Sequence, residues 1–181
     1  MTADNVLDGV AKDLLDAYRT GDPIAPPRET VDGLDLDGAY RIQQLQEQAF
    51  IDAGRTVVGR KIGLTSLAMQ QQLGVDSPDF GFFTDDMVFA DGADIEVSRF
   101  IAPKVEPELA FILGSDLAAD ATIEDVHAAI ASTHLAVEII DSRVRDWDIR
   151  LVDTVADNAS CGAVILDRTP VDVSLEDLPK V

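Results

Sequence analysis

The pattern of apolar residues changes near residue 56, and this change constrains the fold more than any other feature of the sequence. Upstream of it, apolar side chains recur near the helical period in two segments, residues 4–20 and 36–53. Downstream, short apolar runs separated by Gly, Pro and Asp are typical of strands and turns. We therefore predict an α+β fold, in which an N-terminal helical segment (residues 1–55) precedes a strand-rich, mixed β body (residues 56–181).

Strands are expected in the body where β-branched and aromatic residues cluster. The strand candidates are residues 55–66, 86–97, 104–114, 134–144 and 161–167. Two helices are predicted between them, because each follows residues that can cap a helix N-terminus. The first covers residues 67–74 after Thr65 and Ser66, and the second covers residues 123–133 after Thr122.

The remaining polar segments are predicted to lack regular structure. The chain is expected to form loops over residues 20–38 and over most of 141–160, where Pro, Gly and Asp are frequent. The sequence DSPDFG predicts a tight turn, which would give Asp79 an ordinary turn role. His127 and His134 fall within the predicted helix and just after it, and we interpret both as structural.

The chain is strongly acidic, and its charge argues against several classes of partner. Asp and Glu number 34 against 14 Lys and Arg, which gives a formal net charge of −20 and a pI near 4.1. Nucleic acid and anionic membranes should therefore repel the protein. The excess of Asp resembles proteins from salt-loving organisms, in which screening tolerates dense negative charge.

The sequence lacks several common patterns, and these absences bear on the location of the protein and on its chemistry. No apolar run approaches the roughly 20 residues of a membrane span, and the N-terminus lacks the pattern of a signal peptide, so we expect a cytoplasmic protein. The single cysteine, Cys161, has neither a disulfide partner nor metal-ligand spacing and is predicted to be buried. The motifs GxGxxG, CxxC, GxSxG and HExxH and the P-loop are all missing, which argues against nucleotide, zinc and serine-nucleophile chemistry.

Two glutamates stand at the head of the apolar run KVEPELAFIL, residues 104–113. Glu106 and Glu108 are two residues apart and would share one face of a strand, where like charges repel unless a cation or a proton lies between them. Glu138 lies in a second apolar run, LAVEII. Three carboxylates from neighbouring strands would suit Mg²⁺ or Mn²⁺. The alternative is that each is a half-exposed strand residue with a solvated carboxylate.

Lys61 lies in the apolar stretch VVGRKIGL. A lysine in such a strand most often extends its ammonium to water or forms a salt bridge. Beside a cluster of carboxylates and a metal ion, it could instead hold a substrate carboxylate or transfer a proton.

Four stretches together resemble one family of enzymes. They are GRKIGLTSLAMQQQLGVDSPDFG, KVEPELAFIL, AVEIIDSRVRDW and DTVADNAS. The sequence resembles the 2-keto-4-pentenoate hydratase and 4-oxalocrotonate decarboxylase family, within the fumarylacetoacetate hydrolase superfamily, from about residue 36 onward. The resemblance implies a body of the fumarylacetoacetate hydrolase C-terminal-domain type that is truncated at its C-terminus, since family members continue with further strands and a Gly/Ala-rich segment.

The resemblance also implies roles for individual residues. Three of them, Glu106, Glu108 and Glu138, would bind the divalent metal ion, Mg²⁺ or Mn²⁺. Lys61 and Asp79 would form the acid/base and substrate-orienting pair. The pocket would be lined by Ser160 and supported by Asn158.

The implied activity is that of a lyase in the breakdown of aromatic compounds, acting on small 2-oxo or 2-hydroxydienoic acids. The leading hypothesis is a hydratase that converts 2-hydroxypenta-2,4-dienoate (2-keto-4-pentenoate) into 4-hydroxy-2-oxopentanoate. The alternative within the family is a decarboxylase of 4-oxalocrotonate (2-oxo-3-hexenedioate), since both reactions share an enolate intermediate.

Two alternatives from other classes remain. The chain could be a shortened, non-catalytic assembly subunit that binds a full-length partner through an unpaired sheet edge, or a metal-free acidic binding domain. The family resemblance favours a homo-oligomer, and a complex with another enzyme of the pathway is a further option.

Overall fold

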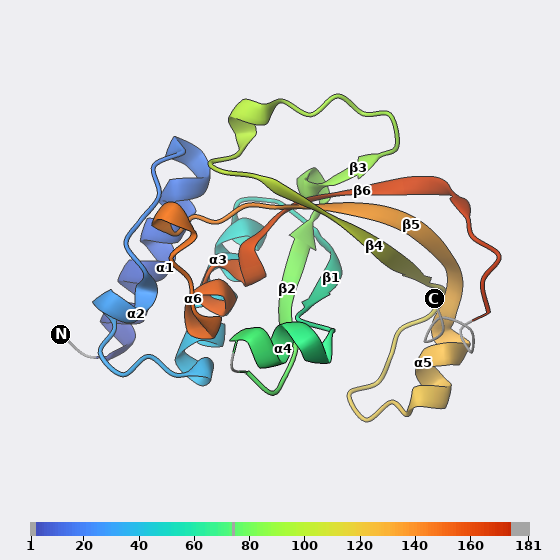
Figure 1. Ribbon diagram of the computed structural model, residues 1–181, viewed down its shortest axis with the longest axis horizontal. Coiled ribbons are helices and arrows are strands. Elements are labelled where there is room, and N and C mark those ends of the chain that lie inside the picture. The colour runs from blue at the N-terminus through green and yellow to red at the C-terminus, as the bar shows by residue number, and fades with distance from the viewer. Residues whose placement is uncertain (1–2, 74, 175–181) are drawn as a thin grey trace.

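The computed structural model describes residues 3–73 and 75–174, and it has the α+β architecture predicted from the sequence (Figure 1). Helices α1 (Ala3–Thr20), α2 (Pro27–Thr30) and α3 (Leu36–Asp52) come first. They gather at one end of the molecule with α6 (Leu151–Ala156), a helix from near the C-terminal end of the chain. None of the helices in the described part of the chain has the length and apolar character of a membrane span.

The described residues of the body form two sheets. Strands β1 (Val57–Gly63) and β2 (Asp79–Thr84) form an antiparallel hairpin, and the helix α4 (Leu67–Leu73) lies between them in the sequence. The second sheet has the order β3-β6-β5-β4 and is mixed, because β3 runs parallel to β6 whereas β6, β5 and β4 are antiparallel. Its strands are β3 (Val88–Ala90), β4 (Lys104–Leu113), β5 (Ile130–Ile140) and β6 (Cys161–Pro170).

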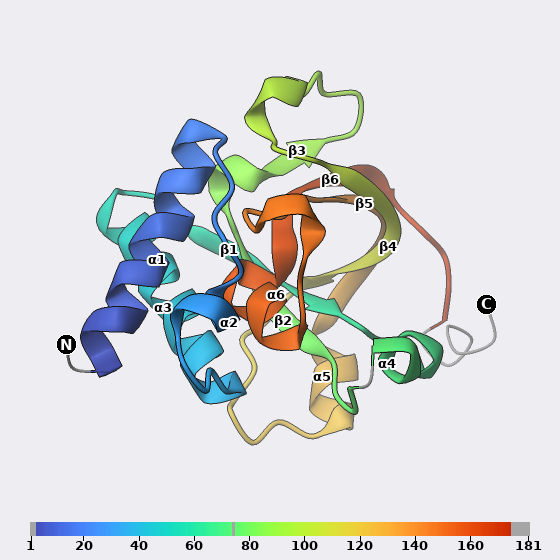
Figure 2. The same ribbon diagram turned by 60° about the vertical axis from the view of Figure 1, so that its left-hand side comes forward.

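The two sheets face each other. In both views the hairpin β1–β2 lies on the concave side of the curved four-stranded sheet (Figures 1 and 2). One apolar cluster joins the hairpin to the sheet, through Phe82 and Phe83 of β2 and Cys161 and Val164 of β6. Cys161 is fully buried, as the sequence predicted.

The N-terminal helices form as predicted because their ends carry the appropriate residues. Asp35 caps α3 by accepting a hydrogen bond from the Gly38 amide at 2.9 Å. Gly54 follows the helix with a φ of +90°, a conformation that glycine adopts readily. A second apolar cluster buries Leu14 and Ile42 against α6, so the helical segment shares its core with the body. The division into separate units at residue 55 stays a prediction.

The structure corrects several boundaries predicted from the sequence. The helix predicted over residues 123–133 is α5 (Ile123–Ala129), because Ile130 to Thr133 pair with β4 as the start of β5. The strand predicted over residues 86–97 is only β3, since the chain turns at Gly92 with a φ of +77°.

Three expectations of irregular structure were also wrong. The predicted loop over residues 141–160 contains α6, whose Leu151, Val155 and Ala156 recur at helical spacing and pack against α1 and α3. The predicted loop over residues 20–38 contains α2, which begins at Pro27. Asp79 begins β2 and does not lie in a tight turn.

The helical core gives a direct test of the fold. Ile42 is fully buried, whereas Ile51 on the same helix is 44% exposed. We expect Ile42→Ala to lower the free energy of unfolding by about 2–5 kcal/mol, because it leaves a cavity among α1, α3 and α6. The matched variant Ile51→Ala should change it by less than about 1 kcal/mol. Urea denaturation measures both values, and equal effects would contradict this packing.

Candidate metal centre

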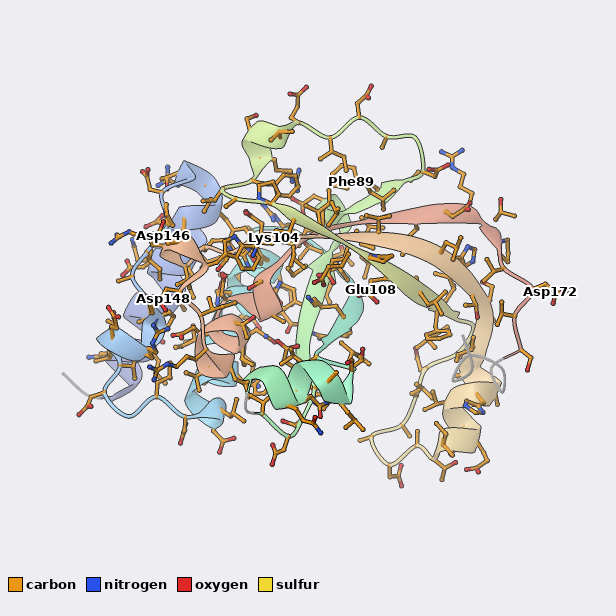
Figure 3. The ribbon with its side chains drawn as sticks, in the orientation of Figure 1. Phe89, Lys104, Glu108, Asp146, Asp148 and Asp172 are labelled. Carbon is orange, nitrogen blue, oxygen red and sulfur yellow. The ribbon has the colours of Figure 1, made fainter. Side chains whose placement is uncertain are left out.

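Three glutamates converge on the concave face of the four-stranded sheet. The register of β4 and β5 places Glu106 directly opposite Glu138, and Glu108 follows Glu106 on the same face. Each of the three residues offers a carboxylate oxygen that lies within 4.8 Å of the other two. Figure 3 shows Glu108 below β4, on the side of the hairpin. Among the described residues, no other group of three or more His, Cys, Asp or Glu could hold a metal ion.

Two of the three carboxyls, those of Glu108 and Glu138, are harder to ionise in the folded protein than in water. Burial raises the pKa of Glu138, Lys61 opposes the shift, and the charges of Glu106 and Glu108 add to it. Burial also raises the pKa of Glu108, followed by repulsion from Glu106, with Lys61 again opposing. A divalent cation between the carboxylates would relieve both the repulsion and the desolvation.

Lys61 reaches this cluster from β1. Its Nζ lies 2.8 Å from Oε1 of Glu138 and donates a hydrogen bond to the carbonyl oxygen of Ala159 at 2.9 Å. Oε1 of Glu138 is buried and has this ammonium as its charged partner. Oε1 therefore keeps a lone pair for another cation.

Asp79 lies on the same face of the hairpin as Lys61. The strand register pairs Lys61 with Gly81 and Gly63 with Asp79, so the two functional candidates are diagonal neighbours and each is opposite a glycine. Asp79 is only 4% exposed, and its Oδ1 has no hydrogen-bond partner. Burial raises the pKa of Asp79, and the charge of Lys61 opposes this shift.

The sequence reasoning missed the two glycines, which leave room for the side chains of Asp79 and Lys61. A Cβ at Gly63 would lie 2.2 Å from Oδ1 of Asp79, and a Cβ at Gly81 would lie 2.9 Å from Cγ of Lys61. Only glycine leaves room for these side chains in their observed positions. In KIG and DFG, a glycine stands two residues after Lys61 and after Asp79. A glycine within a strand often marks the close approach of another group, so this spacing was the available signal.

Asn158 and Ser160 lie in a short 3-10 turn before β6. The side-chain amide of Asn158 accepts a hydrogen bond from the Phe82 amide at 2.8 Å and donates one to the Phe82 carbonyl at 2.9 Å. Asn158 thus supports β2 with both of its polar atoms. The hydroxyl of Ser160 lies 3.2 Å from that of Thr154, and its contact with a substrate stays a prediction.

The site fits a divalent cation on its own chemistry. It offers three carboxylates, which are the hard oxygen ligands that Mg²⁺ and Mn²⁺ prefer. Oε1 of Glu138 has the Lys61 ammonium beside it at 2.8 Å, and Oδ1 of Asp79 is buried without a hydrogen-bond donor, as expected of a group that serves a cation or a reacting molecule.

Known proteins resemble the chain over most of its length, although no model of a protein family matches it. It is 49% identical over 172 residues to a 2-keto-4-pentenoate hydratase of Paraburkholderia xenovorans (strain LB400), a match that covers 94% of this chain and 64% of that protein. It is 39% identical over 168 residues to a 2-hydroxyhexa-2,4-dienoate hydratase of Comamonas testosteroni, a match that covers 91% of this chain and 64% of that protein.

A solved structure gives the same result. The 4-oxalocrotonate decarboxylase from Pseudomonas putida G7, complexed with magnesium and adipate, superimposes with a TM-score of 0.85 at 31% identity. This match covers 92% of the present chain and 63% of that chain. The present chain thus spans slightly less than two thirds of the length of these relatives.

The raised pKa values predict how stability depends on pH and metal. The folded protein holds protons on Glu108, Glu138 and Asp79 more tightly than the unfolded chain does. The free energy of unfolding without metal should therefore fall as the pH rises from the ordinary carboxyl pKa values, 3.8–4.5, through the raised ones. We expect saturating Mg²⁺ to raise the Tm by several degrees near neutral pH and much less near pH 4, where protons compete.

Thermal unfolding followed by circular dichroism tests this expectation in high salt, which suppresses binding to the diffuse surface charge. Glu108→Gln should abolish the Mg²⁺ effect at neutral pH. Glu96→Gln, which changes an exposed carboxylate outside the cluster, should keep it. An equal Mg²⁺ effect in the two variants would show that the ion binds elsewhere.

Proposed function

The chain belongs to the 2-keto-4-pentenoate hydratase and 4-oxalocrotonate decarboxylase family, and from this membership we propose that it is a metal-dependent lyase of small 2-oxo acids. The reaction we assign is the addition of water to 2-hydroxypenta-2,4-dienoate to give 4-hydroxy-2-oxopentanoate, a step in the breakdown of aromatic compounds. The names of the curated relatives support the hydratase reaction. The observation that carries the proposal is the cluster of three carboxylates with Lys61 beside Glu138 at 2.8 Å.

We assign Glu106, Glu108 and Glu138 as the residues that hold Mg²⁺ or Mn²⁺. The bound ion would supply Lewis-acid polarisation of the carboxylate and keto oxygens of a 2-oxo acid. The magnesium of the related decarboxylase supports this choice of ion. Glu138 has two tasks in this proposal, because it also holds the ammonium of Lys61 in place.

Lys61 and Asp79 are the groups that we propose transfer protons. The ammonium of Lys61 lies at the edge of the carboxylate cluster; it would protonate C5, the far end of the diene, and then take up the proton that the 2-hydroxyl loses, which gives an α,β-unsaturated ketone. Water would then add at C4 of this ketone; Asp79 would accept a proton from the water and return it to C3, so that the product is the dienoate plus one water. The unpartnered Oδ1 of Asp79 and its pKa, which burial raises, suit a group that exchanges protons with a reacting molecule. We propose that Ser160 contacts the substrate and that Asn158 supports the pocket from behind.

The sister decarboxylase reaction is the second candidate. The structural match to 4-oxalocrotonate decarboxylase favours it, although that protein is 31% identical and the hydratase of Paraburkholderia xenovorans is 49% identical. The same carboxylates and lysine could support loss of CO₂ from 4-oxalocrotonate. Four further expectations stay predictions: a homo-oligomer, a cytoplasmic location, a complex with another enzyme, and a non-catalytic assembly subunit.

Assays with both substrates test the reaction. We expect consumption of 2-hydroxypenta-2,4-dienoate with Mg²⁺ and little release of CO₂ from 4-oxalocrotonate. Lys61→Met and Asp79→Asn should each lower kcat by about 10²–10⁴-fold, because each removes a proton-transfer group. Lys12→Met, which breaks an exposed pair with Asp16, should leave kcat unchanged. Release of CO₂ from 4-oxalocrotonate without consumption of the dienoate would contradict the hydratase assignment and favour the decarboxylase.

Titration of Mg²⁺ tests the metal centre without any turnover. Calorimetry in high salt should show saturable binding at one site, tightened by oxalate, which mimics the carboxylate and keto oxygens of the substrate. Glu108→Gln should remove this binding, because it deletes one charged ligand of the cluster. Weak Mg²⁺ binding that oxalate does not change would contradict a metal-dependent reaction. The non-catalytic assembly subunit would then be the better hypothesis.

A further inference from the structure

Three consecutive residues before β6 have a left-handed backbone. The φ angles of Asn158, Ala159 and Ser160 are +50°, +49° and +52°. Residues other than glycine disfavour this conformation, because Cβ approaches the following carbonyl oxygen. Contacts from outside the segment must therefore hold it in place.

Arg143 makes contacts at both ends of this segment. Its Nη2 donates to the carbonyl oxygen of Asp157 at 2.6 Å, and its Nη1 donates to that of Cys161 at 2.8 Å. These two carbonyls belong to the residues that come directly before and directly after the left-handed segment. A planar guanidinium presents its donors in a fixed geometry, so it sets the distance between the two ends.

The guanidinium itself is held rigidly. Its Nε donates to Oδ1 of Asp157 at 2.6 Å, and Oδ2 of Asp157 accepts hydrogen bonds from the Arg143 amide at 2.9 Å and the Ser142 hydroxyl at 3.1 Å. The ring of Tyr18 on α1 lies 4.2 Å from the guanidinium carbon. Arg143 is only 1% exposed and Asp157 is fully buried, so water does not loosen the pair.

The opposite side of the segment faces the candidate metal centre. Asn158 binds both backbone groups of Phe82 in β2, and the Ala159 carbonyl accepts the hydrogen bond from Nζ of Lys61. Lys61 in turn pairs with Glu138. A continuous series of contacts therefore runs from Arg143 through the left-handed segment to a proposed metal ligand.

We propose that Arg143 is a positioning residue of the candidate metal centre, which keeps residues 158–160 left-handed and thereby fixes Lys61 beside Glu138. The proposal rests on the proposed function for the identity of that centre. The contacts between Arg143 and the segment stand without it.

The experiment compares Arg143→Lys with Arg28→Lys. Arg28 forms a partly buried ion pair with Asp153 of α6, which makes it a matched control that does not contact the left-handed segment. Two quantities are measured for each variant: Mg²⁺ affinity by calorimetry, and hydrogen exchange of the Phe82 amide, which donates to Oδ1 of Asn158. Exchange is compared with that of the amides of the central strand β5, so a general loss of stability is separated from a local one.

Arg143→Lys should weaken Mg²⁺ binding by about 10–100-fold, the range typical of residues that orient metal ligands. It should also accelerate exchange at Phe82 relative to β5. Arg28→Lys should change Mg²⁺ affinity by less than about twofold, because its contacts are independent of the site. Unchanged Phe82 exchange and unchanged Mg²⁺ affinity in Arg143→Lys would overturn the proposal.

A rescue variant separates positioning from general stability. Glycine adopts a φ near +49° without strain, so Ala159→Gly in the Arg143→Lys background should restore most of the lost Mg²⁺ affinity while it keeps the carbonyl that binds Lys61. No rescue would mean that Arg143 acts only through the stability of the fold, and the proposal would fail. If Arg143→Lys does not fold, Tyr18→Leu, which removes the ring beside the guanidinium, is judged by the same criteria.

Failure of the proposed function gives a different result. If the unsubstituted protein does not bind Mg²⁺, the metal centre is wrong and Arg143 cannot be its positioning residue. Phe82 exchange in the variants would then still report whether Arg143 holds the left-handed segment.

Discussion

Three glutamate carboxylates with oxygens within 4.8 Å of one another repel strongly, and the rest of the site is arranged around that repulsion. The strands β4 and β5 hold the carboxylates together, because the register that pairs Glu106 with Glu138 is set by ten residues of β4 along its whole length. Lys61 offsets part of the negative charge from the facing hairpin. Glu106 and Glu108 are exposed and Glu138 is buried, and the remaining negative charge would suit a small, doubly charged cation.

The site depends on backbone geometry as much as on side-chain chemistry. Gly63 and Gly81 admit Asp79 and Lys61 to one face of a two-stranded hairpin, where any Cβ would displace them. The left-handed segment of residues 158–160 places the Ala159 carbonyl where it accepts a hydrogen bond from Lys61. A carbonyl is a suitable partner here because it binds an ammonium without adding another full negative charge beside the glutamates.

The class of fold and the shared face of Glu106 and Glu108 could be predicted from the sequence because both follow from periodicity, whereas the metal-ligand role of the three glutamates rested on the family resemblance. Helical spacing predicts α1 and α3, and strand spacing alone places Glu106 and Glu108 on one face. Periodicity failed where long-range pairing decided the outcome, since residues 130–133 continue a helical pattern and yet pair with β4 as part of β5. Gly63 and Gly81 were missed for the same reason. They matter only because of the side chains opposite them, and a single sequence does not reveal strand partners.

The charge of the whole protein bears on the order in which ligands reach the site. The proposed substrate is an anion, and a chain with a net charge of −20 repels anions at a distance. Close to the site, three carboxylates outnumber the one ammonium of Lys61, so the local field also opposes a 2-oxo acid when no cation is bound. A divalent cation offsets two of these negative charges. Metal binding should therefore precede substrate binding, and high salt, which screens both interactions, should weaken the attraction of the cation and lessen the repulsion of the anion.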